Sequence, residues 1–234
     1  PVAGMGRLAL DQSIAEALRA GQRWQAWQAE DPQPEPPREL SLERHVAGQR
    51  FLIEDWSADI HRLGNGERLR LVLKAGDTIK DKHPHYPRLI NDWVHHLAIN
   101  AAGLDCPTII VAHDAEHRLP ALSASAAASY LDAILEGWHA GLKRPLPLPV
   151  RTVFALLRKQ RDKPLTAEAA QPHYEGSGRQ TGEVEFAGNG ALRRCFPTAA
   201  ALFEPRAETG PLLAYWASRL YQPLIDQLLQ EGQS

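Results

Sequence analysis

The sequence predicts an α/β fold in which a small mixed sheet of about five strands is flanked by helices. Apolar and polar residues alternate between residues 40 and 75, which is the period-two pattern of strands. The pattern changes to a helical period over residues 89–102 and to a short run typical of a buried strand over residues 108–111. Helical patterns dominate the remaining chain, so we expect more helix than strand.

The N-terminal part predicts a helix followed by a stiff connector. Apolar residues recur there at helical spacing: Leu10, Ile14, Ala17 and Leu18. Gly21 supplies a stop signal, and the prolines of residues 31–37 break any helix and are typical of an extended connector. We therefore place a helical segment with its connector at residues 1–38. A second domain with a helical C-terminal extension is placed at residues 39–234.

Three extended runs predict an antiparallel meander, and they cover residues 40–46, 50–63 and 67–75. Gly64-Asn65-Gly66 separates the last two runs and is a strong hairpin signal, because Asn-Gly accepts the positive φ values of tight turns. Side chains alternate between the two faces of a strand. In the third run one face carries Leu69, Leu71 and Leu73, and the other carries Arg68, Arg70, Val72 and Lys74.

Helices and one more strand pair complete the expected core. A helix is predicted over residues 89–102. Its apolar stripe consists of Leu89, Trp93 and Leu97. The buried strand that follows it is expected to pair with residues 118–122. Two long helices are predicted beyond this pair, over residues 126–142 with Trp138 facing inward, and over residues 213–228 with a kink at Pro223.

The composition argues against several classes of protein. The chain has 234 residues and a formal net charge of −2, so any contact with DNA needs a local basic patch. No apolar run is long enough to span a bilayer, and we expect no membrane partner. Cys106 and Cys195 lie far apart and are interpreted as free thiols in a reducing cytoplasm. Because the chain begins with Pro1 rather than with Met or a signal peptide, we expect a piece of a larger protein.

The order of the central elements resembles the core of the restriction-endonuclease-like nucleases. In those enzymes the third strand carries Asp/Glu-x-Lys and the strand before it carries a second acid, so that two carboxylates hold Mg²⁺ beside the lysine. Here Lys74 matches the lysine, but Val72 stands at the acid position and valine cannot ligate a metal. Asp55 and Asp59, expected on one face of the preceding strand, are the possible residual acids.

Further motifs resemble the C-terminal, nuclease-like domain of the gamma subunit of exodeoxyribonuclease V, the RecC family. Residues 92–103 (DWVHHLAINAAG) are similar to a Trp-x-x-His-Leu…Ala-x-Gly helix of that family, and residues 130–147 to its Leu-rich helix and Pro-Leu-Pro turn. Gly182-Glu183 and the C-terminal Leu220-Tyr221 fit the same region, as does the N-terminal Leu-Asp pair at residues 10–11. The order and spacing of these motifs carry the resemblance over nearly the whole chain.

The resemblance implies a subunit of a helicase–nuclease complex that processes double-strand breaks for recombination. Its partners would be the beta and alpha chains of exodeoxyribonuclease V, which hold the motor and nuclease activities, together with DNA. With Val72 at a ligand position we expect no catalytic residue, no metal and no cofactor. Two alternatives stay open: an active Mg²⁺-dependent exonuclease with a migrated acid such as Asp55, Asp59 or Asp77, and a docking module without DNA contact.

The candidate DNA-binding residues are basic and lie close together in the sequence: Arg68, Arg70, Lys74, Lys80 and Lys82. The first three are expected on one strand face. A basic patch of this kind favours contact with DNA phosphates, which requires no recognition of bases. The alternative is a solvated surface.

Histidines and tryptophans carry two further expectations. His113 and His117 stand at i and i+4, a spacing that brings two metal ligands together on a helix. The apolar run before them favours a strand end or a turn instead, so we expect no metal site. A domain that docks on large partners is expected to expose apolar surface. The candidate segments carry Trp24 and Trp27 near the N-terminus and Trp216 and Tyr221 near the C-terminus.

Overall fold

The computed structural model describes residues 3–159, 163–178, 180–186, 188–204 and 212–230. The chain forms two compact units. The first comprises residues 1–44, 51–131 and 227–234, and the second comprises residues 45–50 and 132–226. The domain boundary that the sequence suggests at residue 38 stays a prediction.

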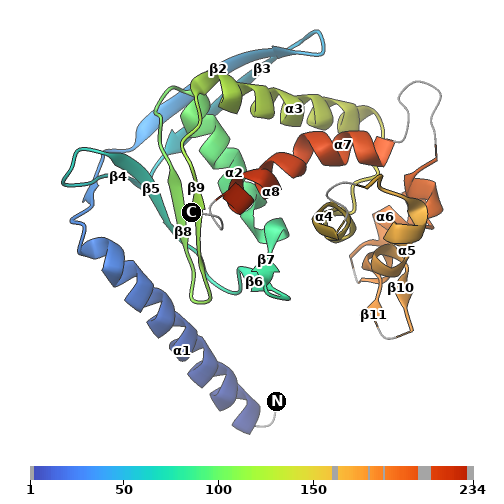
Figure 1. The fold of residues 1–234 in the computed structure, drawn as a ribbon, viewed down its shortest axis with the longest axis horizontal. Helices are drawn as coiled ribbons and strands as arrows, with labels where there is room; N and C mark the ends of the chain where they lie inside the picture. Colours follow the sequence, from blue (N-terminus) through green and yellow to red (C-terminus); the bar gives the residue numbers. More distant parts are fainter. Residues whose placement is uncertain (1–2, 160–162, 179, 187, 205–211, 231–234) are drawn as a thin grey trace. The chain divides into compact units, whose positions relative to one another are not determined.

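Most of the strands lie in the first part of the chain (Figure 1). They are α1 (Ala3–Gln28), β1 (Gln33–Pro34), β2 (Arg38–Val46), β3 (Gln49–Ser57), β4 (Ile60–Arg62), β5 (Arg68–Leu73), β6 (Ile79–Lys80), β7 (His83–Pro84), α2 (Tyr86–Ala101), β8 (Thr108–Val111), β9 (Glu116–Leu119) and α3 (Ala124–Lys143). The rest is mostly helical and consists of α4 (Val150–Lys159), α5 (Ala167–Tyr174), β10 (Gly176–Ser177), β11 (Gln180–Thr181), η1 (Glu183–Glu185), α6 (Gly190–Cys195), η2 (Ala200–Leu202), α7 (Leu212–Leu220) and α8 (Gln222–Gln230).

Five strands of the first unit form one mixed sheet in the order β1-β4-β5-β8-β9. The central pair, β5 and β8, is parallel, with Leu71 opposite Ile109 and Leu73 opposite Val111. The other three pairs are antiparallel. Helix α2 lies in the crossover between the two parallel strands, which cannot be joined by a tight turn. The expected α/β fold, with a mixed sheet of five strands flanked by helices, is confirmed.

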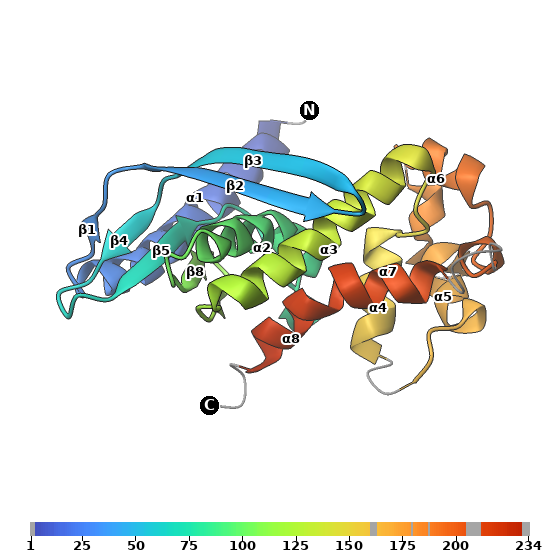
Figure 2. The same ribbon diagram turned by 90° about the horizontal axis from the view of Figure 1, so that it is seen from above.

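Both pairings of the expected meander are present, but the three runs do not form one sheet. β4 and β5 pair antiparallel on either side of the Gly64-Asn65-Gly66 turn, where Gly66 has a φ of +89°. β2 and β3, however, pair in a separate two-stranded sheet (Figure 2). The chain bends at Asp59, which has a φ of +60°, and this bend divides the expected run 50–63 between β3 and β4. β1, which lies in the proline-rich segment that was expected to be a connector, pairs with β4 and forms the edge of the sheet.

Alternation in β5 and β8 places neighbouring side chains on opposite faces of the sheet. One face joins residues of β5 and β8 to two tryptophans of α1: Leu69, Leu71, Ile109, Val111, Trp24 and Trp27. The alternate residue Arg70 lies on the opposite side, toward Asp92 of α2. The expected stop at Gly21 is wrong, because α1 continues to Gln28. This continuation brings both tryptophans onto the sheet.

Helix α2 and the strands after it follow the sequence pattern closely. The apolar stripe of α2 is fully buried, and Gly103, with a φ of +79°, follows its C-terminus. β8 has the expected bounds. β9 starts at Glu116, two residues before the expected strand, because the connecting turn is tight: the amide of Ala112 donates to the carbonyl oxygen of Ala115 at 2.9 Å.

The C-terminal region departs from the expected pattern in three places. The expected helix over residues 213–228 is divided into α7 and α8, and Pro223 stands in the first turn of α8, where its missing N–H costs nothing. Trp216 is buried instead of exposed, and Trp138 is exposed instead of facing inward. Within the described part of the chain, no helix is both long and apolar enough to cross a membrane.

Candidate functional site at the carboxyl ends of β5 and β8

The two parallel strands end side by side, and their following loops meet at one edge of the sheet. The amide of Lys74, the residue after β5, donates to the carbonyl oxygen of Val111, the last residue of β8, at 2.8 Å. Ligand sites in sheets of this kind gather at the carboxyl ends of parallel strands. The side chains that follow β5 and β8 are therefore candidates for a functional site.

Lys74 makes an ion pair with a carboxylate from α2. Its Nζ lies 2.5 Å from Oδ2 of Asp92, and a guanidinium nitrogen of Arg70 lies 4.0 Å from Oδ1 of the same carboxylate. Asp92 and Arg70 are buried, and Lys74 is partly buried. We call these three side chains the Lys74 cluster. Within these three side chains one carboxylate lies between two cations, and the charge of Asp59 also acts on Arg70.

The Lys74 cluster does not fit a Mg²⁺ ion of the nuclease type. Such a site needs two carboxylates whose oxygens are free to coordinate the ion. Val72 supplies no ligand, and the carboxylate of Asp92 is held between Lys74 and Arg70. Two neighbouring cations also repel a third.

The two possible residual acids, Asp55 and Asp59, were expected on one strand next to β5. In the structure they do not share a strand. Asp55 lies on β3, and its carboxylate is 3.7 Å from Nδ1 of His95. Asp59 lies at the bend before β4, where its carbonyl oxygen accepts a hydrogen bond from the amide of Leu71 at 2.9 Å. The expectation of one shared strand face beside β5 is wrong for Asp55, because β3 pairs with β2.

The sequence predicted that Arg70 is exposed on a basic face of β5. This prediction is wrong, because the side chain of Arg70 is buried, with a relative exposure of 7%. This side chain faces α2 because the sheet is covered on both faces. Burial lowers the pKa of its guanidinium, and the nearby carboxylate of Asp92 opposes that shift. Lys80 and Lys82 are exposed on the β6–β7 hairpin. A role of these residues in DNA binding stays a prediction.

Arg68 belongs to a separate arginine cluster around one carboxylate. Glu35, beside β1, lies 2.8 Å from Arg68, 2.6 Å from Arg62 and 3.2 Å from Arg38. The pKa of Glu35 is lowered, first of all by the hydrogen bond from Arg68. The positive charges of Arg68, Arg62 and Arg38 lower it further. Glu35 thus ties β1 to β4 and β5, and three guanidinium groups around one carboxylate leave a positive surface at this edge.

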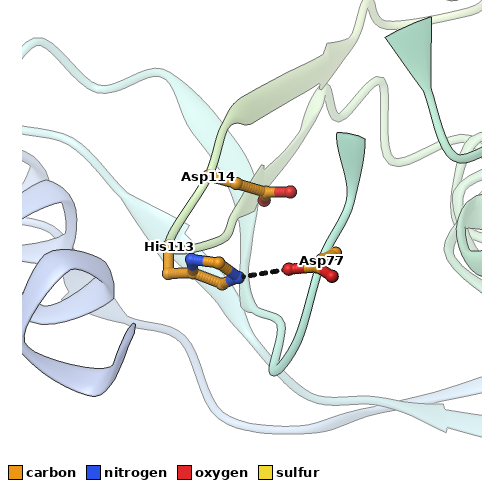
Figure 3. Close-up of side chains that lie close together, drawn as sticks. All are labelled: Asp77, His113 and Asp114. Atoms are coloured by element: carbon orange, nitrogen blue, oxygen red, sulfur yellow. Dashed lines mark hydrogen bonds and ion pairs between the residues drawn. The ribbon is translucent and has the colours of Figure 1, made fainter. Parts of the chain in front are cut away.

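A second group of polar side chains lies at the ends of β5 and β8, and we call it the Asp77 cluster. It consists of Asp77, His113 and Asp114 (Figure 3), and one ligand atom from each lies within 4.8 Å of the others. Nε2 of His113 is 2.9 Å from Oδ1 of Asp77. Figure 3 shows the imidazole turned toward Asp77, with the carboxylate of Asp114 beside them.

A buried polar stripe on α2 supports the sheet from the other side. Asp92, His96 and Asn100 follow one another at i, i+4 and i+8, and all three are buried. Nδ1 of His96 is 3.0 Å from Oγ1 of Thr108, and Asn100 bonds the amide and the carbonyl of Cys106. Burial, together with the charge of Arg70, lowers the pKa of His96 to about 4. This helix face therefore holds a neutral imidazole near the Lys74 cluster.

Comparison with known families decides what kind of domain this is. Residues 1–161 match the family model of the RecC C-terminal domain. The chain belongs to this family. RecC membership indicates a role in the exodeoxyribonuclease V complex and so in DNA repair. Both clusters at the sheet edge lie within the matched residues, and a search of curated proteins found no match to the chain.

Asp77 and His113 of this RecC domain were each named as candidates from the sequence, but their meeting with Asp114 was not predicted, and Asp92 was not singled out. The expected acids lay on or just after strands, whereas Asp92 comes from α2. The signal was present, since polar residues at i, i+4 and i+8 beside an apolar stripe indicate a helix face that buries polar groups. The Asp77 cluster joins residues 36 positions apart, and only the pairing of β5 with β8 brings them together.

Proposed function

We propose that this domain is a non-catalytic, nuclease-like part of the gamma chain of exodeoxyribonuclease V. In this proposal it assembles with the beta and alpha chains in the cytoplasm and guides DNA strands during double-strand break repair and recombination. The observation that carries the proposal is the Lys74 cluster. The lysine that a nuclease would use is bound to Asp92, and Val72 stands where a metal ligand would be needed.

The exposed apolar face of α1 supports a role in assembly. Four large apolar side chains of this helix are exposed: Leu8, Leu10, Ile14 and Leu18. Leu10, Ile14 and Leu18 follow each other at four-residue spacing and form one exposed apolar stripe, whereas Leu8 lies on another side of the helix. Contiguous apolar surface is costly in water and commonly marks a contact with another protein. The tryptophans that were expected to carry this contact, Trp24 and Trp27, instead pack on the sheet.

Assembly can be tested by placing charges on this face. Leu10→Glu combined with Leu18→Glu keeps good helix formers in α1, so the fold should survive. We expect the double variant to bind the beta and alpha chains at least about tenfold more weakly, since charges at a desolvated interface are unfavourable. Leu52→Glu, at an exposed apolar residue of β3, serves as the control. Equal binding by the unmodified chain and the α1 variant would contradict the proposed interface.

The basic hairpin supports guidance of DNA by phosphate contacts. Lys80 and Lys82 are exposed near its tip, and each lysine that contacts a phosphate adds about one to the salt dependence of binding. We expect Lys80→Gln with Lys82→Gln to weaken binding of a single strand uniformly across sequences and to lower that slope. Fluorescence anisotropy at several salt concentrations measures both. An unchanged slope would favour the docking module without DNA contact.

The alternative of an active Mg²⁺-dependent exonuclease needs a migrated acid beside Lys74. Asp55 pairs with His95, Asp77 pairs with His113, and Asp59 lies at a bend. Among the ion pairs of the described residues, the carboxylate at Lys74 is that of Asp92. This arrangement favours the non-catalytic proposal over the enzyme.

A further inference from the structure

We propose that the Asp77 cluster is a binding site for one divalent transition-metal ion, Zn²⁺ or Mn²⁺, which ties the loop after β5 to the loop after β8. The site is distinct from the nuclease position at Lys74 and Val72. It would act as a clamp between two loops and would not take part in cleavage.

The geometry of the three side chains suits a small ion. One ligand atom from each of Asp77, His113 and Asp114 lies within 4.8 Å of the others. Ligands bound at about 2.0–2.2 Å from one ion lie roughly 3–3.5 Å apart. Nε2 of His113 and Oδ1 of Asp77, at 2.9 Å, are already at about this separation, and the ligand atom of Asp114 lies within 4.8 Å of both.

Asp114 is already held in place by hydrogen bonds. Its Oδ2 accepts from the amides of Thr78 and Ile79 at 2.8 and 2.7 Å, and its Oδ1 accepts from Oγ1 of Thr78 at 2.8 Å. A carboxylate oxygen can accept two hydrogen bonds, so Oδ1 keeps a lone pair for a metal. Thr78 in turn lies 2.9 Å from Nε2 of His117. Metal ligands are commonly oriented by an outer layer of this kind.

The cluster also has a path to solvent and a favourable charge. The side chain of His113 is 9% exposed, whereas that of Asp77 is 72% exposed, so an ion can enter on the Asp77 side. Two carboxylates beside one imidazole give the three ligands an excess of negative charge, which favours a divalent cation. Entry of a divalent ion would displace the present contact between His113 and Asp77, and the freed nitrogen would become a ligand.

The donor atoms indicate which metals fit. Imidazole nitrogen suits Zn²⁺ and related metals, whereas carboxylate oxygens suit Mg²⁺, Ca²⁺ and Mn²⁺. A mixed set of one nitrogen and two carboxylates therefore favours Zn²⁺ and Mn²⁺ over Mg²⁺. By the general order of divalent affinities Zn²⁺ should bind more tightly than Mn²⁺. A site that mainly links two loops needs no redox chemistry.

Metal titration of the 234-residue chain, free of any histidine tag, tests this proposal. Zn²⁺ and Mn²⁺ are titrated by calorimetry, with Mg²⁺ for comparison, against the unmodified chain, Asp77→Asn and His113→Gln. We expect one tight site for Zn²⁺, a weaker one for Mn²⁺, and at least a tenfold loss of affinity in each variant. Because Asp77 is exposed, Asp77→Asn should fold normally. This variant keeps the test valid even if the His113→Gln variant fails to fold.

A second histidine–aspartate pair provides a matched control. Asp55 and His95 lie 3.7 Å apart and are both about half exposed, but they have no described third ligand nearby. Asp55→Asn with His95→Gln should therefore leave metal binding unchanged. The proposal also predicts slower hydrogen exchange at the amides of Thr78 and Ile79 when Zn²⁺ is added. Equal affinity of Asp77→Asn and the unmodified chain, or an equal loss in the Asp55/His95 control, would overturn it.

Discussion

The Lys74 cluster and the Asp77 cluster lie at the ends of the same two strands, yet they are built from different charged groups. In the first, one carboxylate lies between two cations. In the second, two carboxylates surround one imidazole. The first stands where a nuclease would hold its metal, but its two cations repel a third. The comparison shows that two groups at one sheet edge can offer different chemistry, because the side chains that surround each of them differ.

Burial separates the two clusters as clearly as charge does. Asp92 and Arg70 are withdrawn from water, so each depends on the other for compensation. Asp77 lies at the surface, where an ion pair contributes little to stability. We therefore expect the Lys74 cluster to matter for folding and the Asp77 cluster to matter for binding.

The largest expected effect follows from removing the shared carboxylate. Asp92→Ala removes the larger of the two negative charges that act on the buried guanidinium of Arg70, and breaking a buried ion pair costs about 3–5 kcal/mol of unfolding free energy in comparable cases. Asp77→Ala removes an exposed partner and should cost at most about 1 kcal/mol. Denaturant unfolding of both variants measures the difference. Similar losses in the two variants would break the distinction between a structural and a surface cluster.

A smaller effect is expected from acid, through His96 on the polar stripe of α2. Burial lowers the pKa of this imidazole from 6.5 to about 4, so the unfolded chain binds the additional proton between these values. The contribution is fully present above pH 6.5 and is lost as the pH falls toward 4, by roughly 1–2 kcal/mol at pH 5. His96→Gln should flatten this decline, measured as the unfolding midpoint against pH. The neighbouring His95→Gln should retain the full decline, and flattening in both would contradict the assignment.

Much of the fold was predictable because it follows local patterns. The apolar stripe of α2, the run that forms β8 and the Asn-Gly turn before β5 each determine one element from neighbouring residues. The place of β1 at the sheet edge was not predictable from a proline-rich connector. The division of the run 50–63 depends on a positive φ at Asp59, which the pattern of apolar residues does not show.

The sequence predicted where the candidate site lies but only some of the residues that form it. Lys74 and Val72 could be placed from strand alternation alone. The burial of Arg70 could not, because the coverage of the second sheet face depends on how α2 packs. Asp92 and the Asp77 cluster depend on contacts between residues far apart in the sequence. Long-range pairing of this kind is determined by tertiary packing.

Cleavage of DNA by the 234-residue chain tests the central claim most directly. Labelled single- and double-stranded DNA is incubated with the chain in Mg²⁺ and, separately, in Mn²⁺, beside Lys74→Met. Because Lys74 is bound to Asp92 and Val72 supplies no ligand, we expect no cleavage above the level of the variant in either metal. Processive cleavage by the unmodified chain that disappears in Lys74→Met, with both proteins folded, would contradict the account and establish the domain as a nuclease.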